Sequence, residues 1–412
     1  MSLFLEIALR ISDFSYPSLH RPDDRLGLRL RENAEGWSRL EGGAFVKINS
    51  AGFRDRERQV VKPSGIFRIA VLGDSYTDGL QVDLDKTFPA LLEQRLNACN
   101  EFGGMTVEVL NFGVDGYGTA QELLTYRYFT ARYSPDVVLL AFFAENDVRN
   151  NSRDLEPEKL RPFFLIKGDA LVEDRSFARS EEFRRRRNSL AVLDQLRNLR
   201  VIQGAYFIRD RINQRRAEQT QDQAVGGRGE EAGIDDAVYS EPSTQQWRDA
   251  WVITERLLAQ LKDEVQRAGA RLIVVVLSTD IQVDPDGEMR AEFMHTRGIS
   301  NIFYPDLRIA KVAANLGIHS ILLAPRLQEI ARREKLYFHG FPNTRMGTGH
   351  WNEAGHRLAA EVLAGELCGS AAVYPHAEAK DKRSLIIADR GNMLNKASRV
   401  EHAQLGLPPG GR

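Results

Sequence analysis

The sequence predicts a doubly wound α/β/α sandwich built on a five-stranded parallel sheet. From residue 67 onward, short runs rich in Val, Ile and Leu alternate with longer helical patterns, which is typical of parallel βαβ units. The runs are apolar throughout, as expected of strands that are buried on both faces. In a chain of 412 residues, a hydrophobic content of 42% is enough for a substantial core.

The first 66 residues come before this alternation and predict an N-terminal strap with short strands. Residues 4–11 fit a short amphipathic helix, but Glu6 interrupts the apolar stretch and no basic region precedes it, so neither a signal peptide nor a membrane span is expected. Residues 12–66 are rich in Arg, Asp, Gly and Pro, with one alternating stretch at 44–49. The expected location is therefore cytoplasmic or membrane-associated.

The core domain is predicted to cover residues 67–369, with strands and helices in alternation. The strands are expected at 67–72, 106–111, 136–143, 271–277 and 318–323, and the helices at about 86–98, 119–132, 244–268, 305–316 and 353–367. Thr87 and Asn352 fit as helix N-caps, and Gly317 and Gly369 follow helix ends.

An insertion at 150–243 separates the third strand from the fourth and is far longer than an ordinary crossover. Residues 179–216 hold eleven Arg against four acidic residues, a net charge of +7, and predict one or two basic amphipathic helices followed by a flexible link at 222–236. These helices are either an Arg-rich solvated face packed on the core, or a lid or surface that meets an anionic membrane or an acidic polysaccharide.

Three further features narrow the class of protein. The net charge of −1 gives no general attraction to nucleic acid. Cys99 and Cys368 lie far apart in the sequence and are expected to be packing residues, because two thiols make neither a disulfide framework nor a metal site. Residues 370–412 lack periodicity and are expected to be a disordered tail.

The first candidate for chemistry is Ser75. Residues 67–76 read Phe-Arg-Ile-Ala-Val-Leu-Gly-Asp-Ser-Tyr, so an apolar run ends at Gly73 and places Asp74 and Ser75 on a turn before a helix. Open α/β sheets carry their sites at the carboxyl ends of the strands, where backbone N–H groups face a ligand. The segment therefore predicts a nucleophile.

Three more segments accompany it: Asn111-Phe112-Gly113-Val114-Asp115-Gly116, Ala144-Glu145-Asn146-Asp147 and Gly349-His350-Trp351-Asn352. In order, spacing and placement, the four segments resemble those of the SGNH (GDSL-like) hydrolase family, over about residues 67–368. The resemblance implies that Ser75 is the nucleophile and His350 the general base. It also implies that the Gly116 N–H and the Asn146 side-chain amide bind the oxyanion.

The chemistry explains these residue types. A serine hydroxyl is a poor nucleophile until an imidazole takes its proton, and the tetrahedral oxyanion needs preorganised donors. A glycine leaves room for the substrate, and an asparagine amide offers two N–H donors without a charge.

One departure from the family pattern concerns the acid that orients the histidine. The family places an Asp three residues before the catalytic His, whereas this chain has Gly347 there. Three alternatives follow: a backbone carbonyl or water orients His350, a remote acid such as Asp306 or Asp280 does so, or activity is reduced or lost.

These observations imply a serine ester hydrolase that removes short acyl groups, such as acetyl, from a carbohydrate or a lipid. The alternatives are a polysaccharide O-acyltransferase that uses the same acyl-enzyme, and a binding or assembly protein for carbohydrates that has lost turnover. The sequence contains neither a metal-ligand constellation nor a phosphate-binding loop, so no cofactor and no metal are expected.

Overall fold

The computed structural model describes residues 2–99, 101–222 and 235–370, and its centre is a five-stranded parallel sheet. The strands are β5 (Ile66–Leu72), β6 (Thr106–Asn111), β7 (Val137–Phe142), β10 (Arg271–Val276) and β11 (His319–Leu322). Their spatial order is β6-β5-β7-β10-β11, which is 2-1-3-4-5 along the chain and is a doubly wound topology. The predicted fold class is confirmed.

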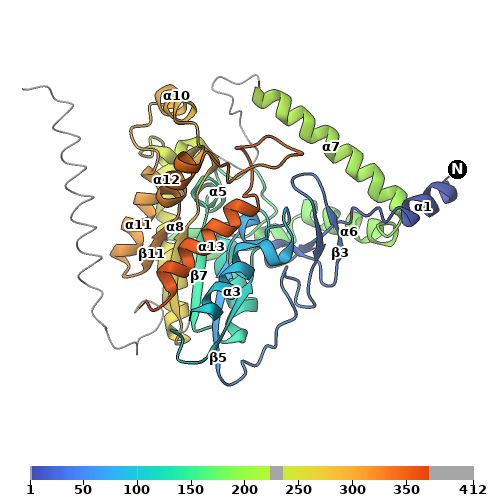
Figure 1. The fold of residues 1–412 in the computed structure, drawn as a ribbon. Helices are drawn as coiled ribbons and strands as arrows, with labels where there is room; N and C mark the ends of the chain where they lie inside the picture. The colour runs from blue at the N-terminus through green and yellow to red at the C-terminus, as the bar shows by residue number, and fades with distance from the viewer. Residues whose placement is uncertain (1, 100, 223–234, 371–412) are drawn as a thin grey trace, which may run out of the picture. The chain divides into compact units, whose positions relative to one another are not determined.

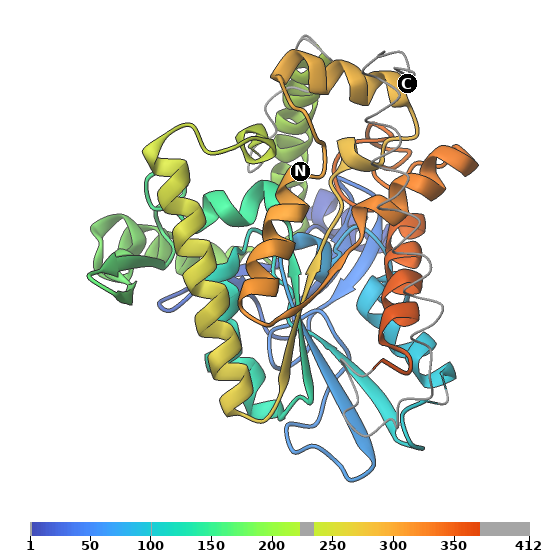
Figure 2. The same ribbon diagram turned by 90° about the vertical axis from the view of Figure 1, so that its left-hand side faces the viewer.

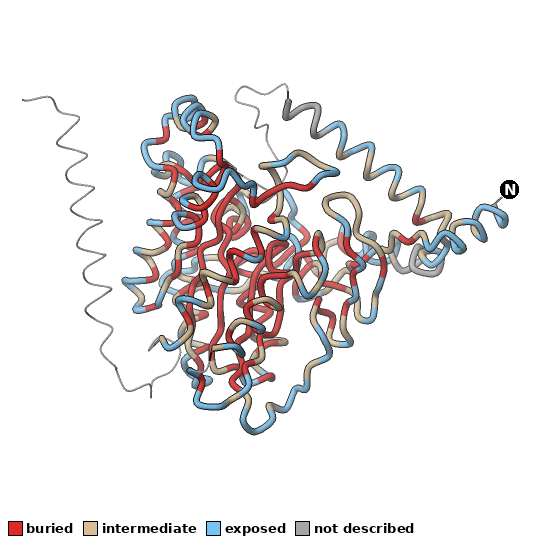
Figure 3. Tube along the Cα trace, viewed as in Figure 1, coloured by how far each residue is buried: buried red, intermediate tan, exposed pale blue. Residues whose placement is uncertain are grey.

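Helices cover both faces of the sheet (Figures 1 and 2). Helices α3 (Phe88–Ala98) and α13 (Glu353–Leu367) pack together over one face, and α4 (Thr119–Thr125), α8 (Gln245–Arg267) and α11 (Tyr304–Asn315) cover the other. Every residue of β7 is buried between these layers (Figure 3). This double burial explains the unbroken apolar runs in the sequence.

The predicted strands agree with the structure to within one residue at each end, and α13 has the predicted bounds. Asn352 caps α13, since its side chain accepts hydrogen bonds from the N–H groups of Ala354 and Gly355. Four further helices were not predicted individually: the short α5 (Ala144–Asn150) and α9 (Asp280–Val283), and the longer α10 (Gly287–Arg297) and α12 (Ala324–Glu334).

The N-terminal segment forms a helix and two hairpins. Helix α1 (Ser2–Ile11) precedes the hairpin of β1 (His20–Asp23) and β2 (Gly27–Leu30), and then the hairpin of β3 (Glu35–Ser38) and β4 (Ala44–Lys47). Apolar side chains of β2 and β4 belong to the same buried cluster as the central sheet, and residues 1–368 form one compact unit. The strap is thus packed on the core.

The insertion contains a hairpin and two helices, where the Arg-rich sequence predicted one or two. The hairpin is β8 (Phe163–Lys167) with β9 (Ala170–Asp174), and the helices are α6 (Glu181–Leu196) and α7 (Arg200–Asp222), of which α7 packs against α1 (Figure 1). Most of the predicted link at 222–236 and nearly all of the predicted tail lie outside the described residues. Among the helices in the described ranges, none is both long and apolar enough to span a bilayer.

The expectation for the two cysteines was wrong. Cys99 and Cys368 form a disulfide, with their Cα atoms 6.2 Å apart and a separation of 269 positions in the sequence. The bond is possible because Cys99 ends α3 and Cys368 ends α13, and these helices pack side by side. Only the tertiary packing brings the two thiols together.

Candidate active site

Ser75 lies at the first residue of α2 (Ser75–Asp78), directly beyond the carboxyl end of β5. Asp74 caps this short helix by accepting the N–H of Tyr76 at 3.0 Å. A Cβ on Gly73 would lie 2.1 Å from the Thr77 hydroxyl oxygen, so the tight turn requires glycine there. Because α2 has only four residues, its dipole adds little to the activation of Ser75.

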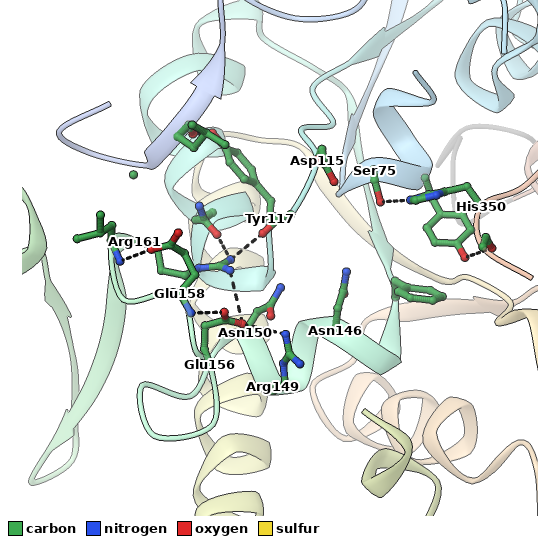
Figure 4. A pocket seen from close by; sticks show the side chains of 18 of the residues that line it. Ser75, Asp115, Tyr117, Asn146, Arg149, Asn150, Glu156, Glu158, Arg161 and His350 are labelled. Carbon is green, nitrogen blue, oxygen red and sulfur yellow. Dashed lines mark hydrogen bonds and ion pairs between the residues drawn. The ribbon is translucent and has the colours of Figure 1, made fainter. Parts of the chain in front are cut away.

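His350 contacts the nucleophile. Its Nε2 lies 2.8 Å from Ser75 Oγ, so the imidazole is placed to accept the hydroxyl proton. The ring belongs to the loop between α12 and α13, and Figure 4 shows it pointing toward Ser75. The structure therefore brings together the predicted nucleophile and the predicted base, which are 275 residues apart in the sequence.

The acid beside His350 is Glu41, which the sequence did not suggest. Glu41 Oε2 lies 2.5 Å from His350 Nδ1, and Glu41 Oε1 accepts the His350 backbone N–H at 2.7 Å. Burial alone would raise the pKa of the Glu41 carboxyl, but the charge of His350 and its hydrogen bonds hold that pKa below the usual value. An ionised carboxylate thus holds the ring in the tautomer that leaves Nε2 free to accept a proton.

Of the alternatives considered for an orienting group, the remote acid is right in kind, because Glu41 is remote in sequence, but the two residues named for it are wrong. Burial raises the pKa of Asp306 to about 7, and its carboxyl accepts a hydrogen bond from Gln282. Asp280 lies at the start of α9, where it accepts the N–H of Ile281. Neither is the partner of His350 Nδ1, and no neutral acceptor is needed because Glu41 is present.

Glycines in the His350 loop explain why the acid comes from elsewhere. Gly347 has φ +85°, and a Cβ there would lie 3.0 Å from both Asp284 Oδ2 and the Tyr337 ring, so an Asp would be strained and would face another carboxylate. Gly349 has φ +77°, and a Cβ there would lie 2.4 Å from Glu41 Oε1. The missing side chain at 349 thus leaves the space that Glu41 fills.

The two predicted oxyanion donors line the same cavity as Ser75 and His350, a cavity of about 340 Å³. Gly116 follows β6 with φ +74°, which makes glycine necessary for its backbone conformation as well as for access. Asn146 lies in the first turn of α5, beyond β7, and points into the cavity (Figure 4). These residues follow the ends of three neighbouring strands, at the switch point of the sheet.

Asp74 positions Asn146. The Asn146 Nδ2 donates one hydrogen bond to Asp74 Oδ2 at 2.8 Å, which leaves one of its two N–H groups for an oxyanion. Burial raises the pKa of Asp74 to about 6, although the hydrogen bonds from Asn146 and Tyr76 lower it. Asp147 accepts the Phe143 N–H at 2.9 Å, the backbone role expected of a turn carboxylate.

Buried aromatic residues contact the loop that carries His350. The His339 Nδ1 donates to the Gly349 carbonyl at 2.7 Å, and burial lowers the pKa of His339 to about 4, so this ring is neutral. The Trp351 indole is fully buried and donates to Ser278 Oγ at 3.0 Å. Tyr76 donates from its hydroxyl to the same Gly349 carbonyl at 3.1 Å.

Comparisons with known proteins give matches among solved structures. No family model and no curated protein matches the chain. An acetylxylan esterase from Geobacillus stearothermophilus is 13% identical over 73% of this chain and 93% of its own, with a TM-score of 0.36. A putative lipolytic protein of the G-D-S-L family from Desulfitobacterium hafniense is 10% identical over 72% and 98%, with a TM-score of 0.34.

A lipase/acylhydrolase from Enterococcus faecalis is 14% identical over 74% of this chain and 96% of its own, with a TM-score of 0.36. The G-D-S-L family, to which the Desulfitobacterium hafniense protein is assigned, is the family that the four sequence segments resemble. At such TM-scores the likeness is no evidence for an activity, so the activity has to be argued from the geometry of the site. Among the residues that the structure describes, no group of three or more His, Cys, Asp or Glu side chains is placed to hold a metal ion.

Proposed function

We propose that this protein is a serine ester hydrolase that works through an acyl-serine intermediate. The observation that carries the proposal is the continuous hydrogen-bond chain from Ser75 Oγ to His350 Nε2 at 2.8 Å and from His350 Nδ1 to Glu41 at 2.5 Å. This is the arrangement of nucleophile, base and orienting acid that acyl transfer requires. Because Glu41 completes the triad, Gly347 in the usual Asp position is no longer a reason to expect reduced activity.

In the first half-reaction, Ser75 Oγ attacks the ester carbonyl carbon while His350 Nε2 takes its proton. The Glu41 carboxylate stabilises the imidazolium, and the Gly116 and Asn146 N–H groups face the oxyanion. When the tetrahedral intermediate collapses, the C–O bond to the alcohol breaks and the alcohol leaves with the proton from His350. The acyl group is then bonded to Ser75.

In the second half-reaction, water attacks the acyl-serine carbonyl and gives its proton to His350. Collapse of the second tetrahedral intermediate releases the acid and returns the proton to Ser75 Oγ. If a polysaccharide hydroxyl took the place of water, the same site would transfer the acyl group instead.

The test uses an active-site label and a simple ester. We expect a fluorophosphonate probe to label Ser75 and p-nitrophenyl acetate to be hydrolysed. Ser75→Ala should abolish both, since it removes the nucleophile, whereas Ser64→Ala, at an exposed serine, should change neither. Labelling without turnover would point to the transferase, and labelling that persists in Ser75→Ala would refute the assignment.

A further inference from the structure

The cavity that contains Ser75 has a second, ionic end. Figure 4 shows Ser75 and His350 on one side, Asn146 between, and a group of charged side chains beyond it. We call this group the ionic wall; it consists of Arg149, Glu156, Glu158, Arg161 and Arg186. None of these residues has a part in the bond-making steps described above.

The ionic wall is held together by its own ion pairs. Arg186 Nη1 lies 2.8 Å from Glu158 Oε2, and Glu156 Oε2 lies 3.4 Å from Arg149 Nη2 and 3.8 Å from Arg161 Nη1. Arg161 also donates to the Gly116 carbonyl at 3.0 Å, which connects the wall to the oxyanion loop. The wall is therefore a surface of paired, hydrogen-bonding charges in the same cavity as the nucleophile.

The charges that line the whole cavity balance. The wall has three guanidinium groups and two carboxylates, and the Asp115 carboxylate also lines the cavity, so three positive and three negative charges give no net charge. A strongly anionic or cationic ligand would find no excess of opposite charge there. A neutral ligand with many hydroxyl groups would find donors and acceptors together, because guanidinium groups donate and carboxylates accept.

We infer that the ionic wall binds the alcohol portion of the ester, and that this portion is a carbohydrate. The inference rests on the proposed function and names its substrate class. Sugar hydroxyls can replace the water that hydrates the charged groups, whereas a long alkyl chain would displace that water without returning a hydrogen bond. A cavity of about 340 Å³ is also at the small end of the range for ligand sites.

The insertion supplies one part of the wall and a matched control. Arg186 comes from α6, which is anchored by Phe183 packing against Phe177 in a small buried cluster with Leu160. The preceding residue, Arg185, pairs instead with Glu181 on an exposed part of the helix and does not line the cavity. The two arginines share the helix and the charge, but only Arg186 is in the wall.

The experiment compares two classes of acetate ester, which differ in having a sugar or an alkyl alcohol. We measure kcat/KM for acetylated xylo- and cello-oligosaccharides and for octyl acetate, with the wild type, Arg186→Ala and Arg185→Ala. The wild type should prefer the acetylated sugars. Arg186→Ala should reduce that preference about tenfold, as expected for the loss of a charged hydrogen bond, and Arg185→Ala should leave it unchanged.

Two results would overturn the inference: a wild type that prefers octyl acetate, or an equal loss of preference in both arginine variants. Binding of the acetylated sugars to Ser75→Ala, followed by saturation-transfer NMR, separates this failure from failure of the proposed function. Arg186-dependent binding without any turnover of either ester in the wild type would refute the esterase but keep the carbohydrate site. Turnover without Arg186-dependent binding would do the opposite.

Discussion

Glu41 fixes the His350 ring by two contacts, one to Nδ1 and one to the backbone N–H of the same residue. Through the two contacts, the carboxylate binds both the imidazole ring and the backbone of His350. Because the pKa of Glu41 is lowered, the carboxylate stays charged and can stabilise the imidazolium that forms when Ser75 loses its proton.

We expect Glu41→Gln to lower kcat by about 10³–10⁴, since the amide keeps the shape of the side chain but loses the charge. The comparison is Glu35→Gln, which removes an exposed carboxylate paired with Lys47 and should leave kcat unchanged. Hydrolysis of p-nitrophenyl acetate at saturation measures both, and circular dichroism checks the fold. Full activity in Glu41→Gln would exclude it as the acid of the triad.

Asp306 is predicted to affect stability and not catalysis. Its pKa is raised to about 7, so between about pH 4 and pH 7 the native state keeps a proton that the unfolded state has lost. The free energy of unfolding should therefore fall as the pH rises through this window. Asp306→Asn should raise the Tm more at pH 8 than at pH 5 and leave turnover intact; a large loss of turnover would instead implicate Asp306 in the site.

At the scale of elements, the triad depends on contact between two loops from opposite ends of the chain. The loop between β3 and β4 carries Glu41, and the loop between α12 and α13 carries His350. Gly42 and Asn343 join them, since the Asn343 side chain accepts the Gly42 N–H at 3.0 Å and donates to the Gly42 carbonyl at 2.7 Å. The N-terminal hairpin thereby completes the site.

Gly349→Ala tests this junction. The new Cβ would lie 2.4 Å from Glu41 Oε1, at a φ of +77°, so the two loops must move apart or the backbone must strain. We expect a fall in kcat of at least tenfold and a lower Tm. Gly365→Ala, in α13, meets no atom within 4 Å and should keep kcat and slightly stabilise the protein. Equal behaviour of the two variants would contradict the role given to the junction.

The sequence predicted the elements better than the contacts between them. Strand bounds could be predicted because a strand buried on both faces leaves a local apolar run. Ser75 follows such a run, and His350 comes shortly before the helix α13, whose bounds were also predicted. Glu41 had no comparable signal, because it lies 309 residues from His350 in a loop. The one indication was negative: Gly347 stands in the expected acid position, which left a remote acid as one of three alternatives.

At the scale of the whole molecule, the disulfide closes a loop that contains most of the described fold. Cys99 and Cys368 join the carboxyl ends of α3 and α13, whereas His350 lies just before the start of α13. With 15 residues, α13 is about 22 Å long, so the disulfide is remote from the triad. Disulfides persist in oxidising compartments and are rare in the cytosol, so the state of these cysteines in the cell bears on the predicted cytoplasmic or membrane-associated location.

The double variant Cys99→Ser/Cys368→Ser should therefore lose stability and keep activity. Since the disulfide constrains the unfolded chain, its removal should lower the free energy of unfolding by about 2–5 kcal/mol, with kcat at 25 °C unchanged. Wild type treated with reductant should show the same lower Tm, and the double variant should not respond to reductant. Protein isolated from cells and denatured in the presence of an alkylating agent should expose no reactive thiol until it is reduced. Two alkylated cysteines before reduction would show that the thiols are free in the cell and would contradict the disulfide.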